Sequence, residues 1–250
     1  MKINQNSLDD PETTLKRGAL IRSKRLLRAF YTECYEYFGD CSRNVPPGIK
    51  LELGSGAGFI KEVMPDVITS EFLPLPTVDK VCSALDLPFP DRSLSAVFLL
   101  DVLHHLPDLN RFFNELNRCL LPGGVVAMVE PANTLWSRFV YRHFHHEPFD
   151  PGVTDWRLPP GGPLSTANGA LPWIVFCRDR VKYEREYPDL EVVRIERFGP
   201  ILYLLSGGFS HRQMLPDWLY SAIRYAEKAL APLNYFIGMF MKIHIRRRYT

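Results

Sequence analysis

Apolar and polar positions alternate in blocks through the first half of the chain, and the blocks predict strands and helices in succession. Short apolar runs bounded by Gly, Pro or acidic residues are typical of buried strands, and they lie at residues 49–53, 67–70, 79–82, 95–100 and 125–129. Residues 109–120 instead carry Phe112, Phe113 and Leu116 at helical spacing. Strands alternating with helices across residues 49–131 predict an α/β fold with a doubly wound, parallel sheet.

The N-terminal segment has a different pattern. Residues 1–14 are polar and predict a loose arm, and residues 15–38 predict one helix. Its apolar stripe is Leu20, Leu27, Tyr31, Cys34 and Phe38. Its other face is basic, with Lys16, Arg17, Arg22, Lys24, Arg25 and Arg28. Two interpretations remain open: a surface helix packed on the edge of the domain, or an amphipathic helix lying on an anionic membrane.

Two further strands are expected in the C-terminal half. Residues 190–197 alternate with many charges, as in an edge strand, and residues 242–248 alternate as an antiparallel closing strand. A helix is expected at 170–187, and another at 214–230 with Leu215, Trp218, Leu219, Ala222, Ile223 and Ala226 along one face. The aromatic and Met-rich run that follows suits either core packing or an interfacial membrane patch. The membrane interpretation therefore involves residues 15–38 and 214–248.

Composition narrows the class of protein without changing the predicted fold. The chain has 250 residues, 46% hydrophobic and 23% charged, which is enough for one large domain. A net charge of +2 makes no case for a nucleic-acid partner. Five cysteines without a C-x-x-C pair indicate reduced thiols in a cytoplasmic protein, and neither a secretory signal nor a membrane-spanning helix is expected. We divide the chain into residues 1–45, 46–131 and 132–250.

A glycine-spaced turn follows the first predicted strand. Residues 51–59 read L-E-L-G-S-G-A-G-F, so Gly54, Gly56 and Gly58 occupy alternate positions behind Glu52. Glycines let a backbone approach a ligand closely, and the following helix offers free N–H groups. The spacing differs from the dinucleotide fingerprint G-x-G-x-x-G and from the phosphate loop of nucleoside triphosphatases. Glu71 ends the second predicted strand 17 residues beyond Gly54, where an acid can accept hydrogen bonds from ribose hydroxyls.

Three motifs occur in a familiar order. After the glycine turn come S-A-L-D-L-P-F-P-D at residues 83–91 and D-V-L-H-H-L at residues 101–106. Together they resemble the class I (Rossmann-like) S-adenosylmethionine-dependent methyltransferases of the type 11 kind. The resemblance implies a mostly parallel, seven-stranded Rossmann-like sheet with helices on both faces. To this the chain adds an N-terminal helix and a hydrophobic C-terminal helical segment.

The resemblance also implies the cofactor and its contacts. The cofactor is S-adenosylmethionine, and the expected contacts are Glu52, Gly54, Ser55, Gly56, Gly58, Glu71, Phe72, Ser83, Ala84, Leu85, Asp101 and Val102. One position departs from the family, which commonly has an acid for the adenine amino group where this chain has Ser83. A hydroxyl still accepts a hydrogen bond but makes a weaker, uncharged contact. Asp86 is the alternative partner for adenine.

Histidines supply the candidate bases. His104 and His105 follow the fourth predicted strand, where ligands bind in open α/β sheets, and one of them is the candidate base. The alternative is that His104 is a buried structural residue and His105 shapes the loop. The long segment 131–169 is expected to be a binding loop, with His145 and His146 as alternative bases. The run H-H-E-x-x-D at 145–150 invites a metal interpretation, but Pro148 breaks the segment and no H-E-x-x-H is present. We therefore predict no metal ion.

These observations predict a methyltransferase in which an acceptor oxygen or nitrogen attacks the sulfonium methyl group in line. The expected acceptor is a small molecule or a lipid- or sugar-linked compound, with O-methylation preferred. The protein is expected in the cytoplasm, with peripheral binding to the inner face of the membrane if the apolar segments dock there. The alternative is a protein that binds the cofactor without catalysis.

Overall fold

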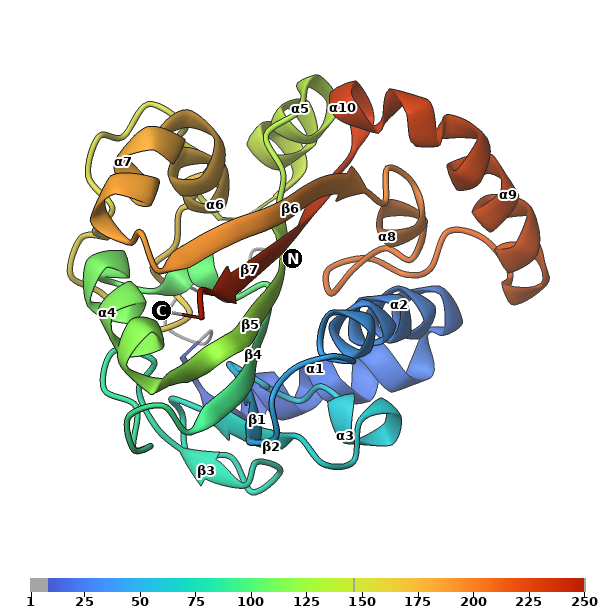
Figure 1. Cartoon of the computed structure of the whole chain (residues 1–250). Helices are drawn as coiled ribbons and strands as arrows, with labels where there is room; N and C mark the ends of the chain where they lie inside the picture. The colour runs from blue at the N-terminus through green and yellow to red at the C-terminus, as the bar shows by residue number, and fades with distance from the viewer. Residues whose placement is uncertain (1–8, 146, 250) are drawn as a thin grey trace.

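The computed structural model describes residues 9–145 and 147–249, and its centre is a seven-stranded mixed sheet (Figure 1). The strand order is β3-β2-β1-β4-β5-β7-β6. The strands are β1 Ile49–Leu53, β2 Ile68–Glu71, β3 Lys80–Val81, β4 Leu94–Leu100, β5 Leu120–Pro131, β6 Leu190–Phe198 and β7 Phe240–Arg247. Strands β1 to β5 are parallel, and β7 is inserted antiparallel between β5 and β6. The predicted fold class, the edge strand and the closing strand are confirmed.

Helices cover both faces of the sheet. The first half contains α1 Pro11–Ser23, α2 Arg25–Cys41, α3 Ile60–Val63, η2 Leu103–His105 and α4 Leu109–Cys119. The second half contains α5 Leu135–Phe144, α6 Leu171–Trp173, η3 Ile174–Arg178, α7 Arg180–Glu186, α8 Leu202–Leu205, η4 Asp217–Leu219, α9 Tyr220–Leu230, η5 Ala231–Leu233 and α10 Asn234–Ile237. In the described residues, no helix is long and apolar enough to cross a membrane.

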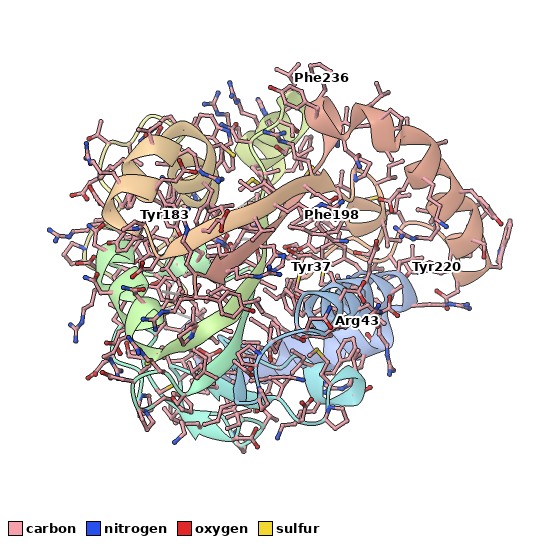
Figure 2. The ribbon with its side chains drawn as sticks, in the orientation of Figure 1. Tyr37, Arg43, Tyr183, Phe198, Tyr220 and Phe236 are labelled. Carbon is pink, nitrogen blue, oxygen red and sulfur yellow. The ribbon has the colours of Figure 1, made fainter. Side chains whose placement is uncertain are left out.

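Alternation along the central strands divides the core into two layers. Val97 and Leu99 of β4 pack with the α4 side, whereas Ala96 and Phe98 pack with the α2 side. This is the period-two pattern of a strand buried on both faces. Figure 2 shows Tyr183, from the α7 layer, and Tyr37, from α2, on opposite sides of the sheet. The two layers hold the strands rigidly, so the carboxyl ends of β1 and β4 form a fixed platform.

The N-terminal helical segment differs from the prediction. It begins at Pro11, where the Asp10 side chain accepts a hydrogen bond from the Glu12 backbone N–H, and it breaks at Lys24, which is extended. The apolar face of α2 is buried in the core with Leu27, Phe30 and Phe38 fully covered. The apolar face of α2 is therefore used by the core and not available to lipid, which agrees with the interpretation of a helix packed on the domain, while membrane binding through residues 15–38 stays a prediction.

Two segments after β5 also differ from the prediction. Residues 131–169 are not wholly a loop, because α5 forms there with a capping box between Thr134 and Ser137. The helix predicted at 170–187 is three short elements, with a π-helical turn that closes where the Asp179 N–H bonds to the Ile174 carbonyl. Strand β5 begins at Leu120, five residues before the predicted strand at 125–129, and the extra residues form a bulge opposite Ser95.

The predicted helix at 214–230 is also shorter than expected. Its regular part, α9, begins at Tyr220 and buries Ile223 and Glu227. Ala222 and Ala226 are exposed, and the Trp218 side chain before the helix is 77% exposed. Glu227 is buried because its carboxylate accepts hydrogen bonds from the Ile201 and Leu202 backbone N–H groups at the start of α8. The predicted apolar face is therefore only partly the buried face.

Candidate functional site

A cavity of about 650 Å³ opens at the carboxyl ends of β1 and β4, where the chain order reverses and α/β sheets bind ligands. All twelve residues predicted to contact the cofactor line it. Sequence reasoning missed much of the remaining wall, which includes Thr14, Arg17, Gly18, Ile21, Tyr31, Tyr35, Leu158, Thr166, Tyr203 and Phe209. Those residues come from α1, α2, the segment before α6 and the α8 region, which no local motif marks.

The glycine turn forms one wall of the cavity. Gly54 has φ +64° and Gly56 has φ +53°, both in the left-handed region that favours glycine. A Cβ atom at Gly54 would lie only 2.5 Å from a methyl carbon of Val102. The Ser55 N–H donates to the Ser70 carbonyl at 2.8 Å, and the Gly56 N–H donates to the Glu71 carboxylate at 2.9 Å. The tip of β2 therefore fixes the shape of the turn.

Two acids stand behind this turn. Glu52 is buried, and burial raises its pKa to about 7. Its Oε2 atom makes no hydrogen bond within the described chain. Both oxygens of Glu71 accept backbone hydrogen bonds, from Gly56 and from Phe72 at 2.7 Å, but each retains a second lone pair. The buried carboxyl group of Glu52 suits a ligand with a positive charge, since one of its oxygens makes no hydrogen bond to any residue that the structure describes. The free lone pairs of Glu71 suit a ligand with hydroxyl groups.

The next part of the cavity wall contains Ser83, the position at which the related family commonly has an acid. Ser83, Ala84 and Leu85 line the wall, and the Ser83 hydroxyl accepts a hydrogen bond from the Leu85 N–H at 3.1 Å. Asp86 is exposed and is absent from the lining. Of the two side chains predicted as partners for adenine, only Ser83 lines the cavity.

Helices α1 and α2 close the cavity on the side opposite the sheet. Gly18 packs so closely that a Cβ there would overlap the Ala57 side chain, and the Arg22 guanidinium lies 3.3 Å from the Ala57 carbonyl oxygen. The Tyr35 hydroxyl accepts the Phe59 N–H at 3.3 Å. The Asp9 carboxylate accepts the Leu164 N–H at 2.7 Å, which joins the chain before α1 to the segment 158–166 above the cavity.

A polar wall faces these apolar and aromatic groups. Asp101 has φ +62°, a costly conformation for a non-glycine residue, and burial raises the pKa of its carboxyl group to about 7. His105, His145 and Glu147 line the same wall. Burial raises the pKa of Glu147, but the neighbouring His104, His105 and His145 more than reverse this, and the net pKa lies well below its usual value.

His104 and His105 have different environments despite being adjacent. His104 is fully buried outside the cavity lining, with Nδ1 2.8 Å from the Glu130 carboxylate. Burial lowers its pKa, but the hydrogen bond to Glu130 and the nearby Glu147 and Asp101 carboxylates raise it well above its usual value overall. His105 lines the cavity, and burial together with the neighbouring His104 lowers its pKa to about 4. His104 therefore cannot touch an acceptor, whereas His105 is neutral and accessible.

Of the two histidines predicted as alternative bases, one lies in this wall. The His145 side chain lines the cavity with Nδ1 3.8 Å from the Glu147 carboxylate, while His146 lies outside the described residues. Asp150 does not line the cavity; its backbone N–H donates to the Asn168 side chain. The sequence run 145–150 is thus not a single cluster. Glu147 instead meets His104 and His105, from a segment about 40 positions earlier.

Comparisons with known proteins agree with this geometry. Residues 51–128 match the family model described as a methyltransferase domain. A 51-residue stretch is 39% identical to 27-O-demethylrifamycin SV methyltransferase from Amycolatopsis mediterranei, covering 20% of this chain and 19% of that protein. A 46-residue stretch is 37% identical to a sterol 24-C-methyltransferase from Gibberella zeae, covering 18% of this chain and 12% of that protein.

A solved structure resembles nearly the whole chain. Geranyl diphosphate C-methyltransferase from Streptomyces coelicolor, in complex with Mg²⁺, geranyl diphosphate and S-adenosyl-L-homocysteine, matches with a TM-score of 0.53. The match covers 99% of this chain and 88% of that one, at 14% sequence identity. At this identity the likeness concerns the fold. The sequence relatives are matched over about a fifth of their length or less.

Proposed function

Residues 51–128 of this chain form a class I S-adenosylmethionine-dependent methyltransferase domain, and from this premise we propose that the protein methylates an oxygen atom of a largely apolar acceptor. The acceptor is a small molecule or a lipid- or sugar-linked compound. The supporting observation is that the His105 imidazole lines the cavity while its Nδ1 is held by the Thr166 carbonyl oxygen. One sequence relative is named as a methyltransferase for a 27-O position and the other as a 24-C-methyltransferase. The choice of oxygen as the acceptor atom therefore rests on the residues of the cavity.

The cofactor half of the cavity is assigned to the motif residues. Glu71 and Ser83 hold the ribose and adenine, and the Gly54–Gly58 turn with Glu52 holds the amino-acid end. When bound, S-adenosylmethionine supplies an electrophilic methyl group on a sulfonium sulfur. Glu52 and Asp101 suit this ligand because both are carboxyl groups in a cavity that receives a cation. Their ionised forms are stabilised when a positive charge enters.

The acceptor half is assigned to aromatic and apolar side chains. Tyr31, Tyr203 and Phe209 line it, and the Arg17 guanidinium lies over the Phe209 ring at 5.4 Å. Leu158 of the overlying segment also lines the cavity. Such a surface binds an apolar body and excludes water from the reacting atoms. The acceptor would enter the cavity past residues 158–166, the segment that lies over it.

His105 is positioned to remove the proton. Its Nδ1 lies 3.1 Å from the Thr166 carbonyl oxygen, which can only accept, so Nδ1 carries the hydrogen and Nε2 keeps its lone pair. Nε2 takes the proton of the acceptor hydroxyl as the acceptor oxygen bonds to the methyl carbon. The cofactor would supply the methyl group, with its carbon–sulfur bond breaking as the carbon–oxygen bond forms and S-adenosylhomocysteine as the second product. The protein contributes mainly alignment, since reacting atoms must approach to about 3–3.5 Å.

The test separates cofactor binding from transfer. Calorimetry should show that wild-type protein and His105→Ala bind S-adenosylmethionine with similar affinity. With ¹³C-methyl cofactor and a panel of hydroxylated aromatic and lipid-linked acceptors, wild type should give O-methyl product, and His105→Ala should lose about 10²-fold or more in rate. A C-methyl signal by NMR would overturn O-methylation. Cofactor binding without transfer to any acceptor would favour the non-catalytic alternative.

A second proposal concerns the outer surface beside the cavity. We propose that α5 and the segment around α10 contact lipid, which modifies the predicted membrane patch at 214–248. Support comes from large apolar side chains on α5 and around α10 that are about half exposed or more, namely Leu135, Phe139, Phe144, Leu233, Tyr235 and Phe236. Helices α5 and α10 touch, and they lie together at one end of the molecule in Figure 1. Interfacial membrane segments are rich in such aromatic side chains.

Vesicle flotation tests this second proposal. Wild type should float with vesicles containing anionic lipid, and Phe144→Ser/Phe236→Ser should not. Val181→Ser is the matched control, because this residue is 79% exposed on α7, away from the patch. Equal flotation of all three proteins would contradict the proposed surface.

A further inference from the structure

His104, His105 and Glu147 bring nitrogen and oxygen atoms close together beside the polar wall. The carboxylate of Glu147 lies 3.4 Å from Nε2 of His104 and 3.7 Å from Nε2 of His105. The ligand atoms of these three residues all lie within 4.8 Å of one another. They come from η2 and from the segment after α5, so the fold alone brings them together.

Both imidazoles are held by their other nitrogen. Nδ1 of His104 lies 2.8 Å from the Glu130 carboxylate, and Nδ1 of His105 lies 3.1 Å from the Thr166 carbonyl oxygen. Glu130 is itself fixed, because its second oxygen accepts the Val102 and Leu103 N–H groups at 2.9 and 2.7 Å. Histidine ligands of metal ions are usually oriented in this way, through the ring nitrogen that does not bind the metal.

The distances from the two Nε2 atoms to the Glu147 carboxylate are longer than those of good hydrogen bonds. N–H···O bonds in proteins extend to about 3.2 Å, and Nε2 of His104, although fully buried, makes no hydrogen bond to any described residue. Zinc binds nitrogen and oxygen ligands at about 2.0–2.2 Å in a tetrahedron, which places the ligand atoms roughly 3.4 Å apart. The two distances join different oxygens of the Glu147 carboxylate to the two imidazoles, so each imidazole lies near that carboxylate at about the spacing that two ligands of one ion would have.

We infer that His104, His105 and Glu147 bind a divalent transition-metal ion such as Zn²⁺ through the two Nε2 atoms and the carboxylate. Two imidazoles and one carboxylate form a ligand set of zinc sites that keep a further position open, and imidazole nitrogen disfavours Mg²⁺ and Ca²⁺. The carboxyl groups of Glu130, Glu147 and Asp101 surround the two histidines, so a dication also balances their charge. This proposal departs from the sequence-based expectation of no metal ion.

The ion has a direct route to the acceptor. His105 and Glu147 line the cavity, so a cation between them has its open position toward the space assigned to the acceptor. This inference rests on the proposed methyl transfer and changes one step of it: with Nε2 of His105 bound to the ion, the ion and not the imidazole would favour ionisation of the acceptor hydroxyl. The acceptor class is then an alcohol or phenol whose oxygen coordinates the ion.

The experiment measures metal binding without cofactor or acceptor. Full-length protein is stripped with a chelator and titrated with Zn²⁺, and separately with Co²⁺ followed by visible absorption. We expect one equivalent per chain, with affinity reduced at least about tenfold in Glu147→Gln and His105→Ala. Glu130→Gln should weaken binding by roughly 10–100-fold, as a change in the group that orients a ligand. His211→Ala, an exposed histidine in the turn after α8, should bind as wild type.

Circular dichroism and thermal unfolding must show that each variant is folded. Two outcomes overturn the site: no saturable binding of either metal to wild type, or unchanged one-equivalent binding in the His105→Ala/Glu147→Gln double variant. The proposed function is judged independently. Methyl transfer by a protein that binds no metal rejects only the site, and metal binding without methyl transfer rejects only the function.

Discussion

At the residue scale, backbone conformation at the glycine turn decides what the cavity can hold. Gly56 has φ +53°, and its N–H is held by Glu71 at the end of a different strand. A Cβ built there meets nothing closer than 3.5 Å, so the constraint on this position is conformational rather than steric. The turn and the β2 acid therefore act as one unit.

Replacing Gly56 with Val should abolish tight binding of S-adenosylmethionine. A branched side chain in the left-handed region costs about 1–3 kcal/mol, so the turn will relax, move its N–H from Glu71 and place methyl groups in the cavity. We expect at least a tenfold loss of affinity by calorimetry, about 1.4 kcal/mol. Gly39→Val near the end of α2, where a Cβ meets only the Met64 sulfur at 3.9 Å, is the control. Undiminished affinity in Gly56→Val would refute the cradle.

Replacing Glu71 with Ala should weaken cofactor binding by about 1–3 kcal/mol, the range for a lost hydrogen bond to a charged group. Two causes contribute, because Glu71 both faces the ribose position and holds the Gly56 N–H. The measurement is the dissociation constant of S-adenosylhomocysteine by calorimetry. Glu62→Ala, which removes an exposed glutamate on α3 paired to Arg28, controls for loss of a carboxylate. Equal affinity in both variants would show that Glu71 makes no contact with the ligand.

At the element scale, the cavity depends on α1, a helix that belongs to no cofactor motif. Its Gly18 packs against Ala57, and Arg22 reaches the carbonyl oxygens of Ala57 and Gly58 at 3.3 and 3.4 Å. Thr14, Arg17 and Ile21 of the same helix line the cavity. The helix thus supports the glycine turn from outside and closes the space that the turn leaves open.

Gly18→Val should weaken S-adenosylmethionine binding although residue 18 lies 33 positions before the matched family domain. The new side chain would overlap Ala57 and displace α1 from the turn. We expect about a tenfold loss of affinity together with faster amide exchange in residues 11–23. The exposed neighbour Ala19, on the other side of α1, provides Ala19→Val as control. Matching affinities for the two variants would mean that α1 is not part of the site.

At the scale of the whole molecule, the fold buries carboxyl groups that it does not fully neutralise. Burial raises the pKa of Glu52 to about 7, with Ser55 opposing and Glu71 adding to the shift. A raised pKa means that the folded state favours the protonated acid. The contribution of Glu52 to stability is therefore full below the unfolded value near 4.5 and is lost as pH rises through 7.

Glu52→Gln should remove this part of the pH dependence. Glutamine resembles the protonated acid, so the variant should match wild type near pH 5 and exceed its unfolding free energy by up to about 3 kcal/mol near pH 8. Urea unfolding at both pH values, without ligand, measures the difference. A variant less stable than wild type by the same amount at both values would show that Glu52 is already ionised in the folded protein.

The fold and the cofactor half of the site could be predicted from local patterns. Apolar runs specify buried strands through their length and period, and the turn at residues 54–58 needs glycine because its backbone enters the left-handed region. Acids at strand ends, such as Glu71 and Asp101, occupy the carboxyl edge of a parallel sheet whatever the rest of the chain does. These features depend on neighbours within a few residues, and all twelve predicted positions line the cavity.

The remaining features depend on contacts between distant segments. The break at Lys24 divides the predicted single helix into α1 and α2, and α1 packs on the glycine turn and forms a wall of the cavity. His104 and His105 are adjacent in the chain, yet only packing sends one beside Glu130 and the other into the cavity. Glu147 joins them across about 40 residues, a distance over which spacing carries no signal. The local sequence specifies secondary structure and which positions are buried. Contacts between side chains that are far apart in the sequence depend on how the helices pack on the sheet.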